Sequence, residues 1–392
     1  MDRAHDVLIP ADTFWLHDPD VRRIYDVFST SQHNIYFVGG CVRNAILRLP
    51  SGDVDMATDA TPQRVKAIAE KADIQTVPTG IDHGTVTLIA GKTAVEVTTF
   101  REDIQTDGRR AVVTFSTDIA KDAARRDFTM NALYARFDRK VIDPLGGLDD
   151  LLAKRVRFIR DPDARIKEDY LRILRFFRFS AWYADPRDGF DPDALAAIGS
   201  NIQGLKSLPA ERIGQEMVKM FGAPDPAMAV AIMRQTGVLH SCLPGADDRL
   251  LPLLIHQEMA LGLSPYMPAR LAILGGEDVR VRLRLSNAIA KEVDTLNATA
   301  SSDMSLAEVA YRHGVSTAQR VAALRGAMAE RLVVRDELAG LQQAAEANFP
   351  VKASDLTPMF QGRALGERLR YLEKVWIAAD FKLTKEELLQ QS

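Results

Sequence analysis

The fold is decided by two neighbouring stretches, Ile35-Tyr-Phe-Val-Gly-Gly-Cys-Val-Arg-Asn44 and Asp53-Val-Asp-Met-Ala-Thr58. In the first stretch, the apolar run 35–38 is typical of a short buried strand, and two glycines end it. We expect a helix after the glycines that continues to Leu49, because Pro50 cannot extend it. The second stretch alternates acidic and apolar residues, which is the spacing of another strand. Together they predict a mixed α/β domain.

The rest of the first 150 residues extends this pattern. Thr61-Pro62 supplies an N-cap and a first-turn proline for a helix at 63–71. The β-branched runs 85–89 and 94–98 are separated by Gly91-Lys92, which predicts a hairpin. Further strands are expected at 112–115 and 134–137, and a helix at 129–133. From about Leu151 the apolar period becomes 3.6 and stays so to the end, so the prediction is an α/β head followed by helical modules.

The composition limits the class of protein. A chain of 392 residues has room for two to four domains. Fifty basic residues against 53 acidic ones exclude a global positive field, so a nucleic-acid partner would need local basic patches. The two cysteines are too few for a disulfide framework or a thiolate metal site. No secretory signal is evident, and the most apolar segment, 250–263, is too short to span a bilayer. We therefore expect a cytoplasmic protein that does not associate with a membrane, and the sequence indicates no protein partner.

Three carboxylates in the head are candidate metal ligands. Asp53 and Asp55 are two residues apart, so on a strand they share one face. Hard ions such as Mg²⁺ prefer oxygen ligands, and two close carboxylates repel each other unless a cation lies between them. Glu96 lies on a strand of the same domain and is a possible third ligand. The alternatives are a solvated turn for the aspartates and a surface position for Glu96.

Two further clusters suit a phosphate group. Gly39-Gly40 lies at a strand-to-helix turn and Arg43 follows on the first helical turn, so backbone N–H groups and a guanidinium fork could approach one anion. Arg125-Arg126-Asp127 precedes the expected helix 129–133. The alternatives are an ordinary glycine turn and a charged helix cap.

A basic helix follows the head. Between Lys154 and Arg178, nine basic residues stand against four acidic ones. Four of the charged residues recur every three positions and flank the apolar stripe Leu171, Leu174 and Phe177, which favours a cleft over a solvated face. An aspartate and an arginine one turn apart also suit the edge of a base. These four residues are Asp169, Arg172, Arg175 and Arg178.

These motifs resemble one family. The sequence is similar to the class II tRNA nucleotidyltransferases, the CCA-adding enzymes, which share their fold with bacterial poly(A) polymerases in the polymerase-β-like superfamily. Eight matching segments follow in family order between about residues 35 and 220. They are Gly39-Gly-Cys-Val-Arg-Asn44, Asp53-Val-Asp-Met-Ala-Thr58, Val95-Glu-Val-Thr-Thr-Phe-Arg101, Asp107-Gly-Arg-Arg110, Arg125-Arg-Asp-Phe-Thr-Met-Asn-Ala132, Asp143-Pro-Leu-Gly-Gly147 through Asp150, Glu168-Asp-Tyr-Leu-Arg172 through Phe179, and Glu211-Arg-Ile213.

The resemblance implies a role for each motif. It implies that Asp53 and Asp55 bind Mg²⁺, with Glu96 as a further catalytic carboxylate. Nucleotide binding falls in two sets. Gly40, Arg43, Arg126 and Asp127 would hold the triphosphate and ribose. Asp169 and Arg172 would read the incoming base, and Arg175 and Arg178 would continue that face. Glu211-Arg212 would brace the helix turn behind the pair, and the loop Asp107–Arg110 would be mobile and help the site switch from C to A.

The resemblance also implies an architecture and a reaction. It divides the chain into a catalytic α+β nucleotidyltransferase head at 25–150, a helical neck at 151–225 that recognises the base, and a helical body and tail at 226–392 that binds tRNA. The expected activity is template-independent addition of C, C and A to the tRNA 3′ end from CTP and ATP, by two-metal nucleotidyl transfer. The alternatives are a poly(A) polymerase, an enzyme that adds part of the C-C-A end, and a catalytically silent RNA-binding module.

The sequence departs from the family pattern at two positions. Asn44 stands where the glycine motif usually ends in Asp, and Tyr170 stands where the base-reading motif often has Pro. The first departure leaves the expected catalysis unchanged, whereas the second could alter the start of the basic helix.

Overall fold

The computed structural model describes residues 7–107, 110–357 and 359–391. The chain divides into two compact units. The first contains the residues up to Met220 together with Ile232–Cys242, and the second contains Phe221–Ala231 and Leu243–Ser392. Each unit is described by itself.

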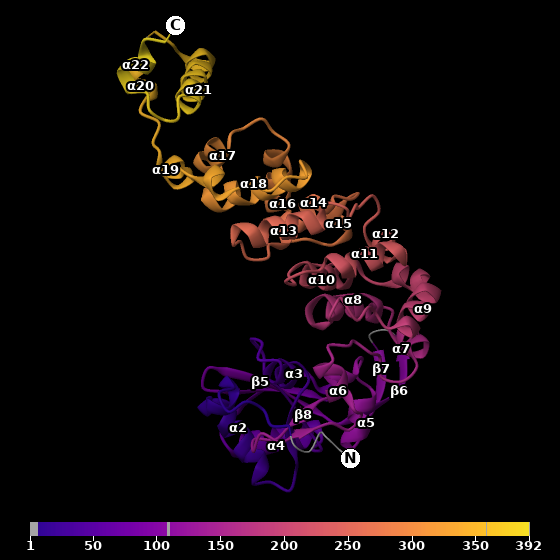
Figure 1. Ribbon diagram of the computed structural model, residues 1–392. Coiled ribbons are helices and arrows are strands. Elements are labelled where there is room, and N and C mark those ends of the chain that lie inside the picture. The colour runs from indigo at the N-terminus through magenta and orange to yellow at the C-terminus, as the bar shows by residue number, and fades with distance from the viewer. Residues whose placement is uncertain (1–6, 108–109, 358, 392) are drawn as a thin grey trace. The chain divides into compact units, whose positions relative to one another are not determined.

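The first unit is built on a seven-stranded sheet with the order β3-β4-β5-β2-β1-β8-β9. β6 pairs with β7 as a separate hairpin, and Figure 1 labels these two strands next to each other. The hairpin of β4 and β5 and the strands expected at 35–38, 85–89, 94–98 and 112–115 are confirmed. The strand expected at 134–137 ends at Ala135, because the chain then turns and the Arg139 amide bonds the Arg136 carbonyl. The strands are β1 (Ile35–Val38), β2 (Asp55–Thr58), β3 (Gln75–Gly80), β4 (Thr85–Ala90), β5 (Thr93–Thr99), β6 (Arg101–Asp107), β7 (Arg110–Phe115), β8 (Tyr134–Ala135) and β9 (Val141–Ile142).

The register of the central strands positions the acidic residues. β2 is antiparallel to β1, with Met56 opposite Phe37, and parallel to β5, with Asp55 opposite Glu96. Asp55 is the first residue of β2, so Asp53 precedes the strand instead of sharing its face as expected. The reason is that β1 ends at Val38, which leaves the residues before Asp55 without an antiparallel partner.

The helices of the first unit follow the sequence signals closely. Thr61 caps α4 by accepting a hydrogen bond from the Arg64 amide, as its Thr-Pro signal predicts. The helix after β1 ends at Ile46, short of Leu49, because Arg48 adopts a left-handed φ of +54°. The helices are α1 (Phe14–His17), α2 (Pro19–Ser29), α3 (Gly40–Ile46), α4 (Pro62–Lys71), η2 (Ile81–His83), α5 (Ile119–Ala124), η3 (Thr129–Asn131), α6 (Gly147–Leu152), α7 (Pro162–Glu168), α8 (Leu171–Tyr183), α9 (Pro192–Asn201), η4 (Ile202–Ser207), α10 (Ala210–Phe221) and α12 (Val238–Cys242); α11 (Ala227–Gln235) contributes to both units.

The helix expected over 129–133 is instead the short 3₁₀ turn η3. The Thr129 amide donates to the Arg157 carbonyl, and Phe128 forms a β-bridge with Phe158, so this segment is held by long-range pairing on one side. The Ala132 amide then bonds the Thr129 carbonyl, which closes a three-residue turn.

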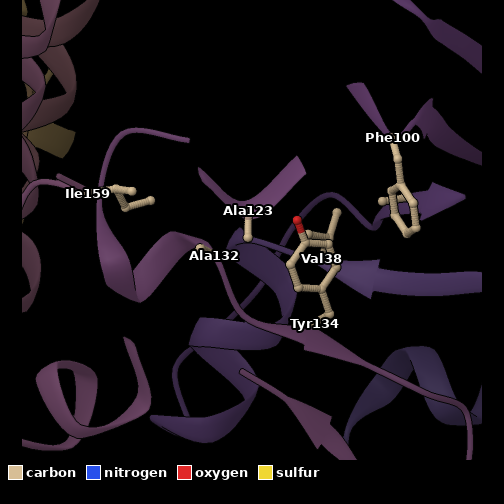
Figure 2. Close-up of a cluster of buried hydrophobic side chains, with 7 residues drawn as sticks. Val38, Phe100, Ala123, Ala132, Tyr134 and Ile159 are labelled. Carbon is tan, nitrogen blue, oxygen red and sulfur yellow. The ribbon is translucent and has the colours of Figure 1, made fainter. Parts of the chain in front are cut away.

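A buried cluster joins β1, β8 and α5. Figure 2 shows the side chains of Val38, Phe100, Ala123, Tyr134 and Ile159 among its members. The Tyr134 side chain is fully buried, and its hydroxyl donates to Asp122 Oδ2 at 2.6 Å. The cluster therefore contains one polar connection, which leads from the core to the charged residues described below.

In its described residues, the second unit contains helices joined by turns and loops, and no strand. Its last segment has a core of its own around Leu372, Trp376 and Leu388. Both cysteines, Cys41 and Cys242, are free and buried. None of the described helices is both long enough and apolar enough to cross a membrane. The helices are α13 (Leu251–Leu261), α14 (Met267–Leu274), α15 (Val279–Arg282), α16 (Asn287–Ala300), α17 (Leu306–His313), α18 (Val315–Met328), η5 (Arg335–Leu338), α19 (Leu341–Glu346), α20 (Ala353–Leu356), α21 (Gly362–Ala378) and α22 (Lys385–Leu389).

Candidate active site

The glycine turn brings backbone close to two arginines. Gly39 has a φ of +71°, a left-handed conformation that favours glycine, and a Cβ there would lie 3.5 Å from Arg126 Nη1. Gly40 opens α3, and a Cβ on it would lie 3.7 Å from Arg43 Nη2. The turn between β1 and α3 therefore exposes main chain beside two guanidinium groups.

Arg43 is held by neutral groups. Its Nε and Nη2 donate to Asn44 Oδ1 at 3.1 and 2.9 Å, and Nη2 also donates to the Tyr183 hydroxyl at 2.7 Å. Nη1 donates to Asn131 Oδ1. The side chain is largely buried, and this burial lowers the pKa of Arg43 although the group stays cationic at neutral pH. Asn44 thus holds the arginine without neutralising it.

The three candidate metal ligands lie around the start of β2, where Asp55 is opposite Glu96 of β5 and Asp53 comes two residues earlier. Burial raises the pKa of Asp55 to about 6, the Glu96 carboxylate adds to the rise, Arg126 opposes it and Asp53 adds again. A cation would relieve this crowding of negative charge, and carboxylate oxygens are the ligands that Mg²⁺ prefers. Within the described part of the chain, no group of three or more His, Cys, Asp or Glu is placed to hold a metal ion. The donor set therefore fits an ion that takes one or two carboxylates and completes its shell with water and phosphate.

A buried aspartate holds the two consecutive arginines. Asp122 is fully buried on α5 and forms ion pairs with Arg125 at 2.7 Å and Arg126 at 3.0 Å. Burial raises the pKa of Asp122, but Arg126 and Arg125 outweigh that effect and hold it at about 2. Arg126 is therefore held in place by the Asp122 carboxylate, which stays ionised.

Asp127 links the head to the basic helix. Its Oδ1 accepts from the Phe128 amide and from Asn131 Nδ2, and Oδ2 accepts from Arg175 Nε at 2.7 Å. Burial raises the pKa of Asp127, yet Arg175 and the hydrogen bonds hold it well below its usual range. Because Asn131 also bonds Arg43, one network joins α3, η3 and α8.

The two expected base-reading residues, Asp169 just before α8 and Arg172 in its first turn, each have a partner. Asp169 pairs with Arg212 of α10 at 2.7 Å, and Arg172 pairs with Glu168. The start of α8 is regular, since the Leu171 amide bonds Asp169 Oδ1 at 3.1 Å. Tyr170 therefore replaces proline without breaking the helix.

Arg178 pairs with a third buried carboxylate, Glu216 of α10. Its Nε donates to Glu216 Oε2 at 2.5 Å, and Arg175 Nη1 lies 3.8 Å from Oε1. The guanidinium of Arg178 also lies 4.4 Å from the centre of the Phe179 ring. The ion pair with Glu216 thus holds the Arg178 side chain against α10.

These groups surround a pocket of about 610 Å³ in the first unit. Eight of the eleven expected site residues line it, and Asp53, Glu96 and Arg178 are not among its described lining residues. Seven arginines and three aspartates face it. The lining residues are Gly39, Gly40, Arg43, Asp55, Arg101, Arg125, Arg126, Asp127, Asn131, Asp169, Leu171, Arg172, Arg175, Phe179 and Arg212.

Sequence reasoning missed Asp122, Tyr183 and Glu216, which hold the pocket arginines. Asp122 could have been found, because it stands four residues before Arg126 on a short helix, the spacing of an ion pair. Nothing local marks the other two, whose partners lie 140 and 38 residues away. The loop expected to switch the site lies partly outside the described residues, at 108–109.

Family models and relatives agree on the class. Residues 35–157 match a model described as the poly A polymerase head domain, and residues 189–250 match one described as the probable RNA and SrmB-binding site of polymerase A. The chain is 33% identical over 390 residues to CCA tRNA nucleotidyltransferase 1, mitochondrial, of Mus musculus, covering 94% of this chain and 88% of the relative. It is 35% identical over 330 residues to a CCA-adding enzyme of Limosilactobacillus fermentum, covering 81% and 80%.

Solved structures share the fold. The Bacillus stearothermophilus CCA-adding enzyme in complex with CTP has a TM-score of 0.73 and 27% identity, over 93% of this chain and 94% of that one. The Thermotoga maritima CCA-adding enzyme complexed with tRNA-CCA has a TM-score of 0.66 and 20% identity, over 98% of both. The chain therefore belongs to the CCA-adding tRNA nucleotidyltransferases, and the expected family and fold class are confirmed. The boundaries 25–150, 151–225 and 226–392 stay predictions, as do the site assignments.

Proposed function

We propose that the chain adds C, C and A to the 3′ end of tRNA from CTP and ATP without a nucleic-acid template. The observation that carries the proposal is the pocket, where seven arginines face three aspartates although the whole chain has a net charge of −3. Such a local excess of fixed positive charge suits a triphosphate.

In the proposed reaction, the tRNA 3′-hydroxyl oxygen attacks the α-phosphorus, a new phosphodiester bond forms, and the bond to the departing pyrophosphate breaks. Arg43 and Arg126 would hold the triphosphate beside the open backbone of Gly40, and Asp127 would fix Arg175 and Asn131 next to it. Since the arginines are already held by Asp122, Asn131 and their other partners, little reorganisation is needed as charge develops.

Nucleotidyltransferases of this family generally use divalent metal ions, and we propose Mg²⁺ for this chain. Asp53 and Asp55 would hold it, with Glu96 adding negative charge next to them. When bound, the ion would stabilise negative charge on the phosphate oxygens. The raised pKa of Asp55, caused by burial and then by Glu96, is the feature of the site that a cation would reverse.

Base choice would rest on Asp169 and Arg172. Cytosine and adenine both present an amino donor beside a ring-nitrogen acceptor, whereas uracil and guanine present a carbonyl oxygen and a ring N–H. A carboxylate can accept from the amino group while a guanidinium donates to the ring nitrogen. With uracil or guanine, the carboxylate would face a carbonyl oxygen and the guanidinium would face a ring N–H. Neither contact is a hydrogen bond, and each unpaired group would cost about 1–3 kcal/mol.

The remaining assignments follow the family. The helical residues 226–392 would hold tRNA, and we propose that the protein acts in the cytoplasm with tRNA and nucleotides as its partners, although the mouse relative is described as mitochondrial.

One assay tests the activity. The protein is incubated with tRNA that lacks its 3′ end, Mg²⁺, and CTP or ATP separately and together. Addition that stops after three nucleotides supports the proposal. A long tail from ATP alone would instead indicate a poly(A) polymerase, the enzyme after which the matching head-domain model is named. No addition at all would contradict both.

A further inference from the structure

Tyr183, the last residue of α8, contacts Arg43, a buried arginine of the pocket that is a candidate for binding phosphate. Its hydroxyl accepts from Arg43 Nη2 at 2.7 Å and donates to Asn44 Oδ1 at 3.3 Å. Its ring also faces the guanidinium, with Arg43 Cζ 4.1 Å from the ring centre. One side chain thus makes both a hydrogen bond and a cation–π contact with Arg43.

Arg43 differs from the other arginines of the pocket whose partners are described. Arg126, Arg172, Arg175 and Arg212 are each paired with a carboxylate. In the described part of the chain, Arg43 forms no such ion pair, and its hydrogen-bond partners are two amides and a phenol. Its charge is therefore oriented without being cancelled.

The hydrogen bonds also fix which way Arg43 points. Four of its five N–H groups are used, by Asn44 twice, by Asn131 and by Tyr183. The N–H that is left is on Nη1. Without the Tyr183 hydroxyl, Nη2 would keep only the Asn44 contact, and three hydrogen bonds instead of four would fix the guanidinium.

We propose that Tyr183 is a positioning residue that holds Arg43 for the nucleoside triphosphate. The inference rests on the proposed function. It assigns to Tyr183 an effect on triphosphate binding that is the same for CTP and ATP, because the hydrogen bonds of Arg43 involve neither Asp169 nor Arg172. Tyr183 therefore has no part in base choice and none in the chemical step beyond ordering the phosphates.

The test compares Tyr183→Phe with the wild type. This variant removes only the hydroxyl and keeps the ring, so its thermal midpoint should match that of the wild type. Trp182→Phe is the matched control, since the adjacent Trp182 is exposed and its Nε1 bonds the Lys219 carbonyl instead of the pocket. The measurements are the Kd for CTP and ATP by calorimetry without tRNA, and kcat and KM for CMP, AMP and UMP addition.

Tyr183→Phe should raise Kd and KM by about tenfold for both nucleotides, the loss expected for one hydrogen bond to a charged group. The value of kcat and the preference for CTP over UTP should stay at wild-type levels. Tyr183→Ala, which also removes the ring contact, should raise Kd further. The control should leave all these values unchanged.

Three results would overturn the inference. They are a Tyr183→Phe protein with unchanged Kd, one with a lower kcat at unchanged KM, and one with a reduced preference for CTP over UTP. Failure of the proposed function is separable, because Kd is measured without tRNA. If the wild type binds CTP but extends no RNA, a weaker Kd in Tyr183→Phe would still support the role of Tyr183.

Discussion

Three buried acidic side chains order arginines that line the pocket or lie beside it. Asp122 holds Arg125 and Arg126, Asp127 holds Arg175, and Glu216 holds Arg178. An arginine fixed in this way loses little side-chain freedom when a phosphate binds, so preorganisation contributes to affinity in addition to charge. The same pairing reduces the net charge of these groups, whereas Arg43 forms no ion pair in the described part of the chain and keeps its full charge.

The metal assignment predicts the effect of Asp55→Asn. This change keeps the shape but removes the negative charge, so kcat for both CMP and AMP transfer should fall by at least about a thousandfold. Binding of tRNA should hardly change, because the carboxylate grips no RNA. Asp59→Asn is the control, as Asp59 bonds His33 and Asn34 outside the described pocket lining. Substantial turnover by Asp55→Asn at saturating Mg²⁺ would refute the assignment.

Asp169→Ala tests where the base is read. Without the carboxylate, the preference for CTP over UTP should fall by about tenfold or more, while triphosphate binding through Arg43 and Arg126 is largely kept. The measurement is kcat/KM for all four nucleotides. Because Arg212 holds Asp169 at 2.7 Å, Arg212→Met should show a smaller loss of the same preference. A CTP:UTP ratio equal to that of the wild type in Asp169→Ala would place base reading elsewhere.

Asp122 predicts a pH-dependent stability. Its folded pKa of about 2 lies below the ordinary value of 3.8, so its ion pairs stabilise the fold above about pH 4, and this contribution is lost as the pH falls toward 2. The size is about 2 kcal/mol. Asp122→Asn should therefore be less stable than the wild type in urea at pH 7, and the difference should shrink at pH 3. A difference that stays constant over this range would show that the charge of Asp122 is not what stabilises the fold.

At the scale of elements, local sequence signals predict most helices and strands of the head but few of the side-chain contacts between them. β1, the capped helix α4 and the hairpin of β4 and β5 are encoded by apolar runs, a Thr-Pro pair and a glycine turn. The start of β2 was misplaced because strand pairing, which depends on where β1 ends, decides it. The expected site residues that line the pocket come from motifs, whereas Tyr183 and Glu216 meet their partners only through the fold. Long-range side-chain partners leave no periodic signal in a single sequence.

Gly204 accommodates the unusual Tyr170 at the start of α8. A Cβ on Gly204, in the 3₁₀ turn η4, would lie 2.1 Å from Tyr170 Cδ1. Gly204→Ala should therefore destabilise the first unit by about 1–3 kcal/mol and displace the adjacent Asp169, which lowers kcat/KM. Urea unfolding and CMP addition measure the two effects. The double variant Gly204→Ala with Tyr170→Ala should recover stability relative to Gly204→Ala alone, and no recovery would contradict the clash.

At the scale of the whole molecule, charge and cores are distributed unevenly. The net charge of −3 coexists with a strongly basic pocket, so overall charge says little about a nucleotide site. The pocket belongs to the first unit, and the second unit has its own cores and its own buried ion pair. Two units with separate cores are expected to unfold in separate transitions, and CTP should raise only the midpoint of the unit that binds it.

Arg270 offers the test of this division. It is almost fully buried in the second unit, where it pairs with Glu258 at 2.8 Å and donates to the carbonyls of Phe221, Ala223 and Pro224. Arg270→Met would leave Glu258 with Arg320 alone, 3.6 Å away, and would strand the carbonyls, so it should cost about 3–5 kcal/mol. In calorimetry, the transition that does not respond to CTP should fall by about 10 °C, whereas the CTP-dependent transition should stay in place. Arg363→Met is the control, because that side chain is 92% exposed and should move neither transition. A single transition that shifts as a whole in Arg270→Met would show that the two units unfold together.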